Sequence, residues 1–379
     1  MKPEGRFGSQ VPAGVGNARS GRGLCAALLL VFLFKGMAEN PPTSWQALVP
    51  PVPPLEIPAD IAQWQEKRAG IRSMLQQLLG HFPERPEHPK VTILSRTRES
   101  GYWREKFVFD DGIGGTVPGY LLTPLTDGPH PAVLYCHWHG GEYGIGKEEI
   151  FQTNHTPVVP GPTLAGQGYV VLAIDAPCFG ERNGQGPDRE SGSAGEASAA
   201  KFNLWIGRTL WGWMLRDDLM ALDYLASRPE VDAHRLGVTG ISMGATRTWW
   251  LMALDDRLKV GVAVACLTRY QDLIAAGGLK HHGIYYYLPG LLEHFDTEAV
   301  VACIAPRPIL FLTGEVDGGS PASGVREIER TAAPVWDLYR SPTNFVSRLY
   351  PGLGHVYTPE MWSSMVEWMG RHLAPGRKP

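Results

Sequence analysis

The feature that most constrains the fold of this chain is a series of short, wholly apolar runs separated by helical stretches. The runs are Ala132–Cys136, Tyr169–Ile174, Leu236–Thr239, Val260–Ala265 and Ile309–Leu312. Runs of this length, without polar alternation, are typical of parallel strands covered on both faces. Helical patterns at 203–227 and 245–253 lie between them. This alternation predicts a doubly wound α/β sheet.

The segments on either side of these runs complete the predicted domain. Strands at 91–95, 103–109 and 119–123 are joined by turns, and we expect them to form an antiparallel N-terminal part of the sheet. A strand at 345–350 and a helix at 359–373 end the domain. The stretch 183–201 is poor in apolar residues and is interpreted as a surface loop.

The N-terminus has the features of an export signal. Arg19 and Arg22 precede an apolar run of eleven residues, Leu24–Phe34, and Gly36-Met37-Ala38 follows. A positive flank, a short apolar stretch and a small-x-small end are typical of a secretory signal peptide, whereas a bilayer span needs about 20 residues. We expect cleavage after Ala38 and a secreted or periplasmic protein; an uncleaved anchor is the alternative.

The sequence thus predicts three regions. Residues 1–38 form the signal peptide, 39–90 a proline-rich extended arm followed by a helix at 59–79, and 91–379 the α/β domain. Removing residues 1–38 takes away five of the 35 Lys and Arg and one of the 38 Asp and Glu, which leaves a formal net charge of −7. A mildly acidic chain without a basic block is a poor candidate for binding nucleic acid, and no membrane span is expected after cleavage.

Four cysteines remain after residue 38. They are Cys136, Cys178, Cys266 and Cys303. Their spacing matches no zinc pattern. Export permits disulfides, but three of the four lie in or beside apolar runs, so buried thiols and disulfide bridges both remain open.

The stretch Gly240-Ile-Ser-Met-Gly244 is the first candidate for chemistry. It follows the apolar run 236–239 and opens a helical stretch. Functional groups collect at the carboxyl ends of parallel strands, and a serine on a tight turn between a strand and a helix is exposed there as a nucleophile. Glycine on both sides lets the strand and the helix pass closely. Ser242 is therefore the predicted nucleophile; a plain helix N-cap is the alternative.

A serine hydroxyl needs a base and an orienting carboxylate. His355 follows the last predicted strand in a glycine-containing loop. Asp317 lies in the turn Gly314-Glu-Val-Asp-Gly-Gly-Ser320 after the strand 309–313, with Glu315 as the alternative acid. The resulting chain order of serine, acid and histidine is that of an α/β-hydrolase.

The loop after the strand 132–136 reads His137-Trp-His-Gly-Gly-Glu142. An oxyanion needs two donors: we expect the amide of Met243 to be one, and the amide of His139 or Gly140 to be the other. The H-x-H pattern also raises zinc as an alternative. Because no further carboxylates and histidines follow at suitable distances, we expect no metal and no cofactor.

Aromatic side chains near these motifs are candidates for an apolar or sugar-stacking wall. Trp138, Trp249 and Tyr286 are the predicted substrate-binding residues, although several aromatics in these stretches must belong to the core. His281 and His282, just before the tyrosines, are expected to line a small cap over the pocket; plain loop residues are the alternative.

At this point the chain resembles the secreted α/β-hydrolases of the acetyl xylan esterase and dienelactone hydrolase-like groups. The stretches that carry the resemblance are Gly119-Tyr-Leu-Leu-Thr-Pro124, His137-Trp-His-Gly-Gly-Glu-Tyr-Gly-Ile-Gly-Lys147, Ile174-Asp-Ala-Pro-Cys-Phe-Gly-Glu-Arg182, Gly240-Ile-Ser-Met-Gly244, Ala305-Pro-Arg-Pro308 and Gly354-His355. Two departures stand out: the nucleophile position holds Ser242 where dienelactone hydrolases use cysteine, and Met243-Gly244-Ala245 replaces the Gln-Gly-Gly usual in cephalosporin-C deacetylase-type esterases.

The resemblance implies a serine hydrolase that cleaves carboxylic esters, with acetyl esters of carbohydrates as one substrate class. The expected partner is a small-molecule or carbohydrate ester, and the oligomeric state stays open. Two alternatives remain. One is a serine peptidase of the prolyl-oligopeptidase type, although only about fifty residues precede the first strand where those enzymes carry a large N-terminal domain. The other is a non-catalytic binding protein on the same fold.

Overall fold

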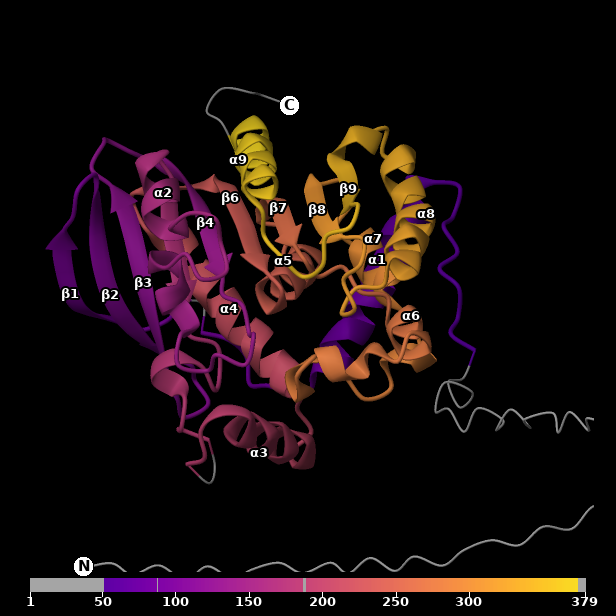
Figure 1. The fold of residues 1–379 in the computed structure, drawn as a ribbon, viewed down its shortest axis with the longest axis horizontal. Coiled ribbons are helices and arrows are strands. Elements are labelled where there is room, and N and C mark those ends of the chain that lie inside the picture. The colour runs from indigo at the N-terminus through magenta and orange to yellow at the C-terminus, as the bar shows by residue number, and fades with distance from the viewer. Residues whose placement is uncertain (1–50, 87, 187–188, 374–379) are drawn as a thin grey trace, which may run out of the picture. The chain divides into compact units, whose positions relative to one another are not determined.

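The computed structural model describes residues 51–86, 88–186 and 189–373, and the fold it shows is built on one nine-stranded sheet (Figure 1). The strand order is β1-β2-β3-β5-β4-β6-β7-β8-β9. The strands are β1 (Val91–Arg98), β2 (Tyr102–Asp110), β3 (Thr116–Pro124), β4 (His130–Cys136), β5 (Val170–Ile174), β6 (Val231–Ile241), β7 (Leu258–Val264), β8 (Ile309–Gly314) and β9 (Phe345–Tyr350).

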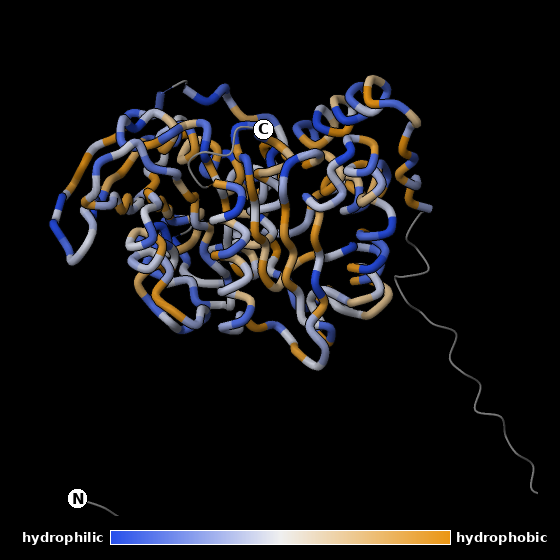
Figure 2. Tube along the Cα trace, turned by 90° about the horizontal axis from the view of Figure 1, so that it is seen from above, coloured by the Kyte–Doolittle hydropathy of each residue, from blue (hydrophilic) through white to orange (hydrophobic). Residues whose placement is uncertain are grey.

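The pairing of these strands follows the sequence pattern. The pairs β1–β2, β2–β3 and β3–β5 are antiparallel, and every pair from β5–β4 to β8–β9 is parallel. The predicted doubly wound, mostly parallel sheet with antiparallel N-terminal strands is confirmed, and each predicted strand is present. The central strands are coloured mostly as hydrophobic in Figure 2, because helices cover both of their faces.

Helices form a layer on each face of the sheet. The α-helices are α1 (Ile61–Leu79), α2 (Pro160–Gly166), α3 (Gly192–Trp205), α4 (Leu210–Ser227), α5 (Met243–Leu254), α6 (Tyr270–Ala275), α7 (Thr297–Ala302), α8 (Ala322–Leu338) and α9 (Pro359–Leu373). Short 3₁₀ helices are η2 (Gly146–Phe151), η3 (Gly180–Arg182), η4 (Gly278–His281), η5 (Ile284–Tyr286), η6 (Leu291–Glu293) and η7 (Pro342–Asn344).

The two layers form separate cores. Neighbouring residues of one strand divide between them: Leu134 packs in the core with α1, α4, α5, α7 and α8, whereas Val133 packs in the core with α2 and α9. Since successive side chains of a strand point to opposite faces, a run apolar at every position is what this sandwich requires.

Three helical regions differ from the sequence-based predictions. The stretch 183–201, interpreted as a surface loop, contains most of α3, and that prediction is wrong. The single helical stretch 203–227 is broken at Gly207, whose φ of +73° ends α3 before α4 begins. Helix α8 was not predicted at all. By contrast, α1, α5 and α9 lie where helices were expected, and Asp60 caps α1 by accepting a hydrogen bond from the Gln63 N–H.

Three further predictions concern export, membrane association and cysteines. The signal segment 1–38 and the first part of the arm lie outside the described residues. Within the part of the chain that the structure describes, no helix has the length and hydropathy needed to cross a bilayer. The four cysteines Cys136, Cys178, Cys266 and Cys303 are all free and buried. Of the two open alternatives, the structure therefore has buried thiols.

Candidate active site

Three side chains from separate loops meet at the carboxyl edge of the sheet. Ser242 follows β6, Asp317 follows β8 and His355 follows β9. The Ser242 hydroxyl lies 2.8 Å from His355 Nε2, and His355 Nδ1 lies 2.7 Å from Asp317 Oδ2. Both distances are within hydrogen-bonding reach. In this arrangement a proton can pass from the hydroxyl oxygen to the imidazole nitrogen, while the carboxylate fixes the tautomer of the ring.

The backbone at Ser242 is strained into the shape that exposes its hydroxyl. Its φ of +58° and ψ of −118° lie in a region that only glycine adopts readily. Two neighbouring glycines explain how the turn fits. A Cβ at Gly240 or Gly244 would lie 2.3 or 2.0 Å from the Cys136 carbonyl oxygen, so the turn packs directly against the end of β4. This close approach is why the motif needs glycine on both sides of the serine.

The structure decides between the two candidate acids. The side chain of Asp317 is only 2% exposed, and its second oxygen accepts a hydrogen bond from the Gly319 N–H at 2.9 Å. Glu315 instead forms an ion pair with Arg326 at 2.9 Å. A Cβ at Gly314 would lie 2.1 Å from the Gly354 carbonyl oxygen, so the loops that carry the aspartate and the histidine are packed against each other. Of the two candidates, Asp317 is therefore the carboxylate that contacts His355.

Both histidines of the H-x-H pattern have their ring nitrogens occupied by protein partners. The Nε2 of the buried His137 accepts a hydrogen bond from the Ala176 N–H, and its Nδ1–H donates to the Trp138 carbonyl at 2.7 Å. Burial lowers the pKa of His137 well below its usual range, which keeps the ring neutral. His139 Nδ1 accepts from the Gly141 N–H, and its Nε2–H donates to Glu196 at 3.0 Å. These nitrogens hold the loop together and leave no lone pair for zinc.

Two buried glutamates that the sequence did not single out hold the same loop. Glu196 on α3 accepts hydrogen bonds from His139 and, at 2.9 Å, from the Tyr143 hydroxyl. Glu149 in η2 accepts from the Tyr135 hydroxyl and from the Trp138 N–H, each at 2.7 Å. Burial raises the pKa of Glu149 to about 7. A glutamate inside the Ala- and Ser-rich stretch 192–200 was the available signal for Glu196; nothing in the sequence marks Glu149.

The predicted aromatic wall is only partly present. Trp138 is partly exposed, and its ring stacks on His155 and lies over Gly140. Trp249 is fully buried and donates its ring N–H to the Cys266 carbonyl. Tyr286 is 1% exposed and stacks on His282 at 4.1 Å. Trp249 and Tyr286 therefore belong to the core and offer no open face to a substrate.

The predicted cap corresponds to the segment 276–293. Within it, His282 Nε2–H donates to the Gly319 carbonyl at 2.8 Å, so the segment is attached to the loop that carries Asp317. Burial lowers the pKa of His282 to about 4, and the ring is therefore neutral. Gly283 lies against His139, since a Cβ there would be 2.9 Å from its Nε2. The segment thus borders both the acid loop and the loop after β4.

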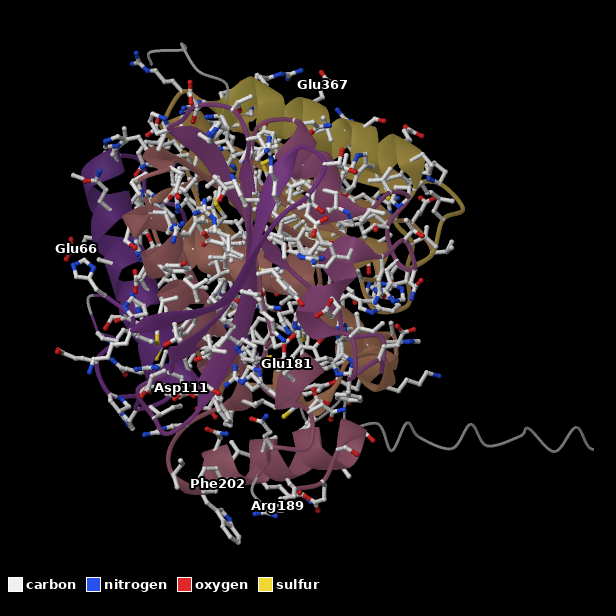
Figure 3. All side chains as sticks on the ribbon, turned by 90° about the vertical axis from the view of Figure 1, so that its left-hand side faces the viewer. Glu66, Asp111, Glu181, Arg189, Phe202 and Glu367 are labelled. Atoms are coloured by element: carbon white, nitrogen blue, oxygen red, sulfur yellow. The ribbon has the colours of Figure 1, made fainter. Side chains whose placement is uncertain are left out.

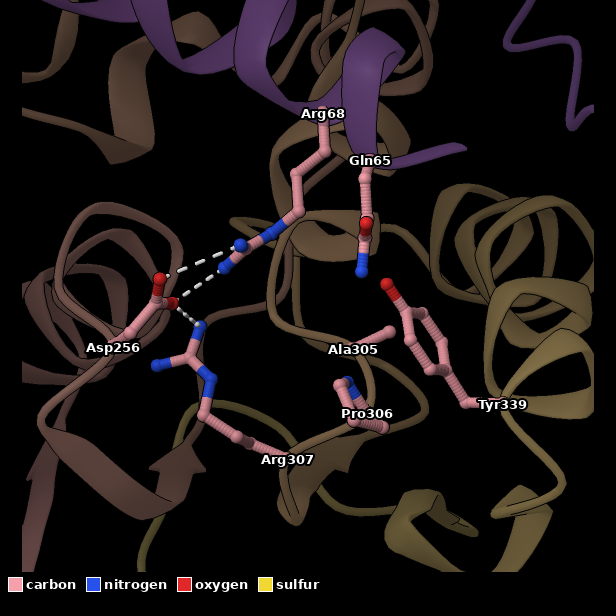
Figure 4. A pocket seen from close by; sticks show the side chains of 7 residues that line it. All are labelled: Gln65, Arg68, Asp256, Ala305, Pro306, Arg307 and Tyr339. Carbon is pink, nitrogen blue, oxygen red and sulfur yellow. Dashed lines mark hydrogen bonds and ion pairs between the residues drawn. The ribbon is translucent and has the colours of Figure 1, made fainter. Parts of the chain in front are cut away.

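A pocket of about 500 Å³ lies at the opposite edge of the sheet (Figure 4). It is lined by Gln65, Arg68, Asp256, Ala305, Pro306, Arg307 and Tyr339. Asp256 and Arg307 precede β7 and β8, whereas Ser242 and Asp317 follow the strands that bear them. The pocket is therefore separated from the Ser242 site by the length of the strands.

The sheet topology and the strained serine turn between β6 and α5 together define an α/β-hydrolase. Residues 53–320 match the sequence model of the Abhydrolase family. The chain belongs to this family, and the resemblance stated from its motifs is confirmed at this level.

Several known proteins are similar to this chain. YtaP of Bacillus subtilis strain 168, named as a hydrolase, is 39% identical over 282 residues, which cover 72% of this chain and 91% of that protein. YuxL of the same organism, named as an uncharacterized peptidase, is 27% identical, but the match covers only 31% of its length.

Among solved structures, a Bacteroides fragilis protein named as an acetyl xylan esterase has a TM-score of 0.67 and 19% identity, covering 86% of this chain and 93% of its own. A glucuronoyl esterase from Solibacter usitatus has a TM-score of 0.64 and 17% identity, covering 85% and 98%. At these identities the likeness is one of fold.

Proposed function

We propose that this protein is a serine esterase that cleaves carboxylic esters through an acyl-enzyme. The observation that carries the proposal is the hydrogen-bonded series from Asp317 through His355 to Ser242, with both contacts under 3 Å. A general base must lie within hydrogen-bonding reach of the proton that it removes, and an orienting group must hold it there. The exposure of His355, 35% of its side chain, leaves room for a substrate beside it.

The reaction would proceed in two halves. The Ser242 oxygen attacks the ester carbonyl carbon while its proton passes to His355 Nε2. The tetrahedral intermediate then collapses, and His355 returns that proton to the departing alcohol. A water molecule attacks the acyl-enzyme with its proton again taken by His355, and collapse releases the acid as the proton returns to Ser242. Asp317 stabilises the imidazolium in both halves and is not itself protonated.

The oxyanion would be stabilised by backbone amides. We assign one to Met243, which is the first residue of α5 and follows the nucleophile. We assign the other to His139 or Gly140, because the amide of the preceding Trp138 already donates to Glu149. Loss of one such donor typically costs about 10²–10³ in rate.

For the substrate we propose an ester of a carbohydrate, with acetyl esters as the first class to test. The names of the structural neighbours, acetyl xylan esterase and glucuronoyl esterase, support this choice by analogy of fold. The partly exposed Trp138 ring beside the site is the one predicted aromatic that can still contact a sugar.

The decisive experiment compares purified protein and a Ser242→Ala variant on 4-nitrophenyl acetate, acetylated xylo-oligosaccharides and a dipeptide anilide. Ester hydrolysis that Ser242→Ala abolishes is the expected result. Cleavage of the anilide in preference to the esters would support the peptidase alternative that YuxL suggests. No turnover and no labelling of Ser242 by a fluorophosphonate in folded protein would identify a non-catalytic member of the family.

We also propose that the protein is exported and that residues 1–38 are removed. The support is the sequence pattern of Arg19, Arg22 and the apolar run 24–34. The mass of the protein recovered from the periplasm or medium should correspond to a chain that begins at Glu39. A full-length chain retained in the membrane fraction would instead indicate the uncleaved anchor.

A further inference from the structure

Glu149 is a buried carboxylate that the proposed mechanism does not use. It lies in η2, is 1% exposed, and directs both carboxylate oxygens at groups belonging to β4 and the loop that follows. The Tyr135 hydroxyl donates to Oε1 and the Trp138 N–H donates to Oε2, each at 2.7 Å. Hydrogen bonds to an ionised acceptor are shorter and stronger than neutral ones, and both distances fit that class.

We propose that Glu149 is a positioning residue that holds the loop 138–141 in its active shape only while its side chain is ionised. This rests on the proposed function, because that loop carries His139 and Gly140, one of which is assigned to the oxyanion. The loop begins at the amide that Glu149 binds. The Trp138 ring lies so close to Gly140 that a Cβ there would be 2.2 Å away, so the position of Trp138 determines that of Gly140.

The charged and titratable groups around Glu149 oppose one another. Arg247 on α5 favours the ionised carboxylate, but its guanidinium is already bonded to the buried Asp218 of α4. Glu142 in the loop favours the protonated form. Tyr135 contributes its hydroxyl as a donor, and burial keeps this phenol and the neighbouring Tyr357 un-ionised by raising their pKa values.

The net result is that burial dominates, and the pKa of Glu149 rises to about 7. The two protonation states are therefore both populated near neutral pH. A carboxylate accepts two strong hydrogen bonds, one at each oxygen. A carboxylic acid carries its proton on one oxygen, which can donate to a rotated Tyr135 hydroxyl, and the other oxygen then accepts the Trp138 N–H as a neutral group, by a weaker bond. Protonation thus weakens one of the two contacts that hold the start of the loop.

The neighbouring residue provides a matched control. Glu148 lies in the same 3₁₀ helix and has the same side chain, but 42% of that side chain is exposed. Glu149→Gln retains an oxygen for the Trp138 N–H and places an amide beside the Tyr135 hydroxyl, which can rotate to accept. It therefore keeps the packing and removes the titration, whereas Glu148→Gln removes a glutamate without touching the loop.

The test follows ester hydrolysis and hydrogen exchange together, from pH 5 to 9, in wild type, Glu149→Gln and Glu148→Gln. Any pH dependence that does not arise from Glu149 is common to all three proteins. We expect the ratio of kcat at pH 8 to kcat at pH 6 to be about three- to tenfold larger in wild type and Glu148→Gln than in Glu149→Gln. Exchange protection of the 138–141 amides, corrected for the intrinsic rate, should fall below pH 7 in the same two proteins and stay constant in Glu149→Gln.

Each outcome separates the two proposals. Identical pH profiles and identical protection in wild type and Glu149→Gln overturn the role of Glu149 and leave the esterase intact. A pH-dependent loss of protection in a wild type without esterase activity supports the positioning role and overturns the proposed function. If Glu149→Gln does not fold, Tyr135→Phe decides: loss of its donor disfavours the carboxylate, so the fall in protection should move to higher pH, and an unmoved profile overturns the proposal.

Discussion

At the scale of single residues, the glycines around Ser242 are positions where the structure leaves no room for a side chain. A Cβ at Gly244 would lie 2.0 Å from the Cys136 carbonyl oxygen, which is a backbone atom of a buried central strand and cannot move aside. We expect Gly244→Ala to destabilise the fold by about 1–3 kcal/mol and to displace the serine. Urea denaturation measures the first effect, and labelling of Ser242 by a fluorophosphonate measures the second.

Gly370 in α9 is the control for this substitution, since a Cβ there would meet nothing within 4 Å. Gly370→Ala should raise stability by about 0.5–1 kcal/mol, because alanine is the better helix former. Equal losses of stability in both variants would contradict the steric explanation.

The choice of triad acid is a second prediction at this scale. Asp317→Asn can no longer hold His355 in the tautomer that accepts the serine proton, so we expect kcat to fall by about 10⁴ with an unchanged fold. Glu315→Gln removes a carboxylate two residues away that pairs with Arg326, and activity should stay within twofold of wild type. The ratio of kcat/KM in the two variants measures the difference, and a larger loss in Glu315→Gln would reverse the assignment.

Glu149 also gives a prediction about stability. In the folded protein its pKa is raised from 4.5 to about 7, so the native state binds this proton more tightly than the unfolded chain. The associated stability is fully present below about pH 4.5 and is lost as pH rises through 7, by up to about 3 kcal/mol. The free energy of unfolding of wild type relative to Glu149→Gln should therefore decrease between pH 5 and 8. A rising difference would contradict the direction of the shift, and Glu148→Gln should show none.

The sequence was sufficient for residues whose role depends on local pattern and insufficient for those that act through distant contacts. Ser242 was found because its turn requires a glycine on each side, and Asp317 because its loop follows a recognisable strand. Glu149 and Glu196 were not predicted, since their partners lie 11 and 57 residues away, although a glutamate in an Ala- and Ser-rich stretch was a signal for Glu196. Trp249 was predicted to bind substrate because the sequence places it close to the nucleophile. The sequence does not show whether its ring faces a pocket or the core.

At the scale of secondary-structure elements, every strand was predicted, whereas helices such as α3 and α8 were not. A strand that is apolar at every position between glycine-rich turns admits few other structures. Helix α3 has an Ala-, Gly- and Ser-rich sequence that resembles a loop, and its outer face exposes residues such as Phe202 (Figure 3). Helix α8 does carry the spacing of an amphipathic helix in Val325, Ile328, Ala332 and Val335, all buried, so its sequence pattern indicates a helix.

The contact between α3 and the loop after β4 gives a prediction for an element. Glu196→Ala leaves the His139 imidazole and the Tyr143 hydroxyl without their acceptor, which costs about 1–3 kcal/mol for buried donors. We expect α3 to loosen, with faster proteolysis between residues 189 and 208 and a kcat/KM lower by about tenfold or more. Lys201→Ala, an exposed change on the same helix, should affect neither quantity. Unchanged proteolysis in Glu196→Ala would show that α3 is held by its other contacts.

At the scale of the whole molecule, the fold brings together residues that the chain separates widely. Ser242 and His355 are 113 positions apart, and they meet because β6, β7, β8 and β9 are consecutive in the sheet and end at the same edge. The adjacency of these strands follows from the alternation of strands and helices, which was predictable. The attachment of α1 to the opposite edge of the sheet was not predictable, because it depends on side-chain contacts between segments more than 180 residues apart.

This attachment is a cluster of three arginines around Asp256, and Figure 4 shows two of them, Arg68 and Arg307. Arg68 and Arg72 extend from α1 and contact the Asp256 carboxylate at 2.5 and 2.8 Å, and Arg307, just before β8, contacts it at 3.2 Å. Burial is outweighed by these guanidinium groups, which hold the pKa of Asp256 well below its usual range. Because the folded pKa is depressed, the stability that the cluster provides is present above about pH 4 and is lost as pH falls below it.

We therefore expect Asp256→Asn to lower the melting temperature at pH 7 by several degrees. Asp256 is 54% exposed, so solvent screening limits the attraction between its carboxylate and the arginines. Most of the lost stability therefore comes from repulsion among the three arginines that remain. One of them, Arg307, has a side chain only 12% exposed. The difference from wild type should shrink with added salt, and it should begin to decrease only as pH falls below about 4, toward the depressed pKa of Asp256. Glu367→Gln, which breaks an exposed pair with Arg371 on α9, is the control and should shift the melting temperature by less than one degree. Calorimetry of the three proteins across pH and salt measures this. Equal melting temperatures of Asp256→Asn and wild type at pH 7 would show that α1 is held by apolar packing of Trp64 and Leu75 rather than by charge.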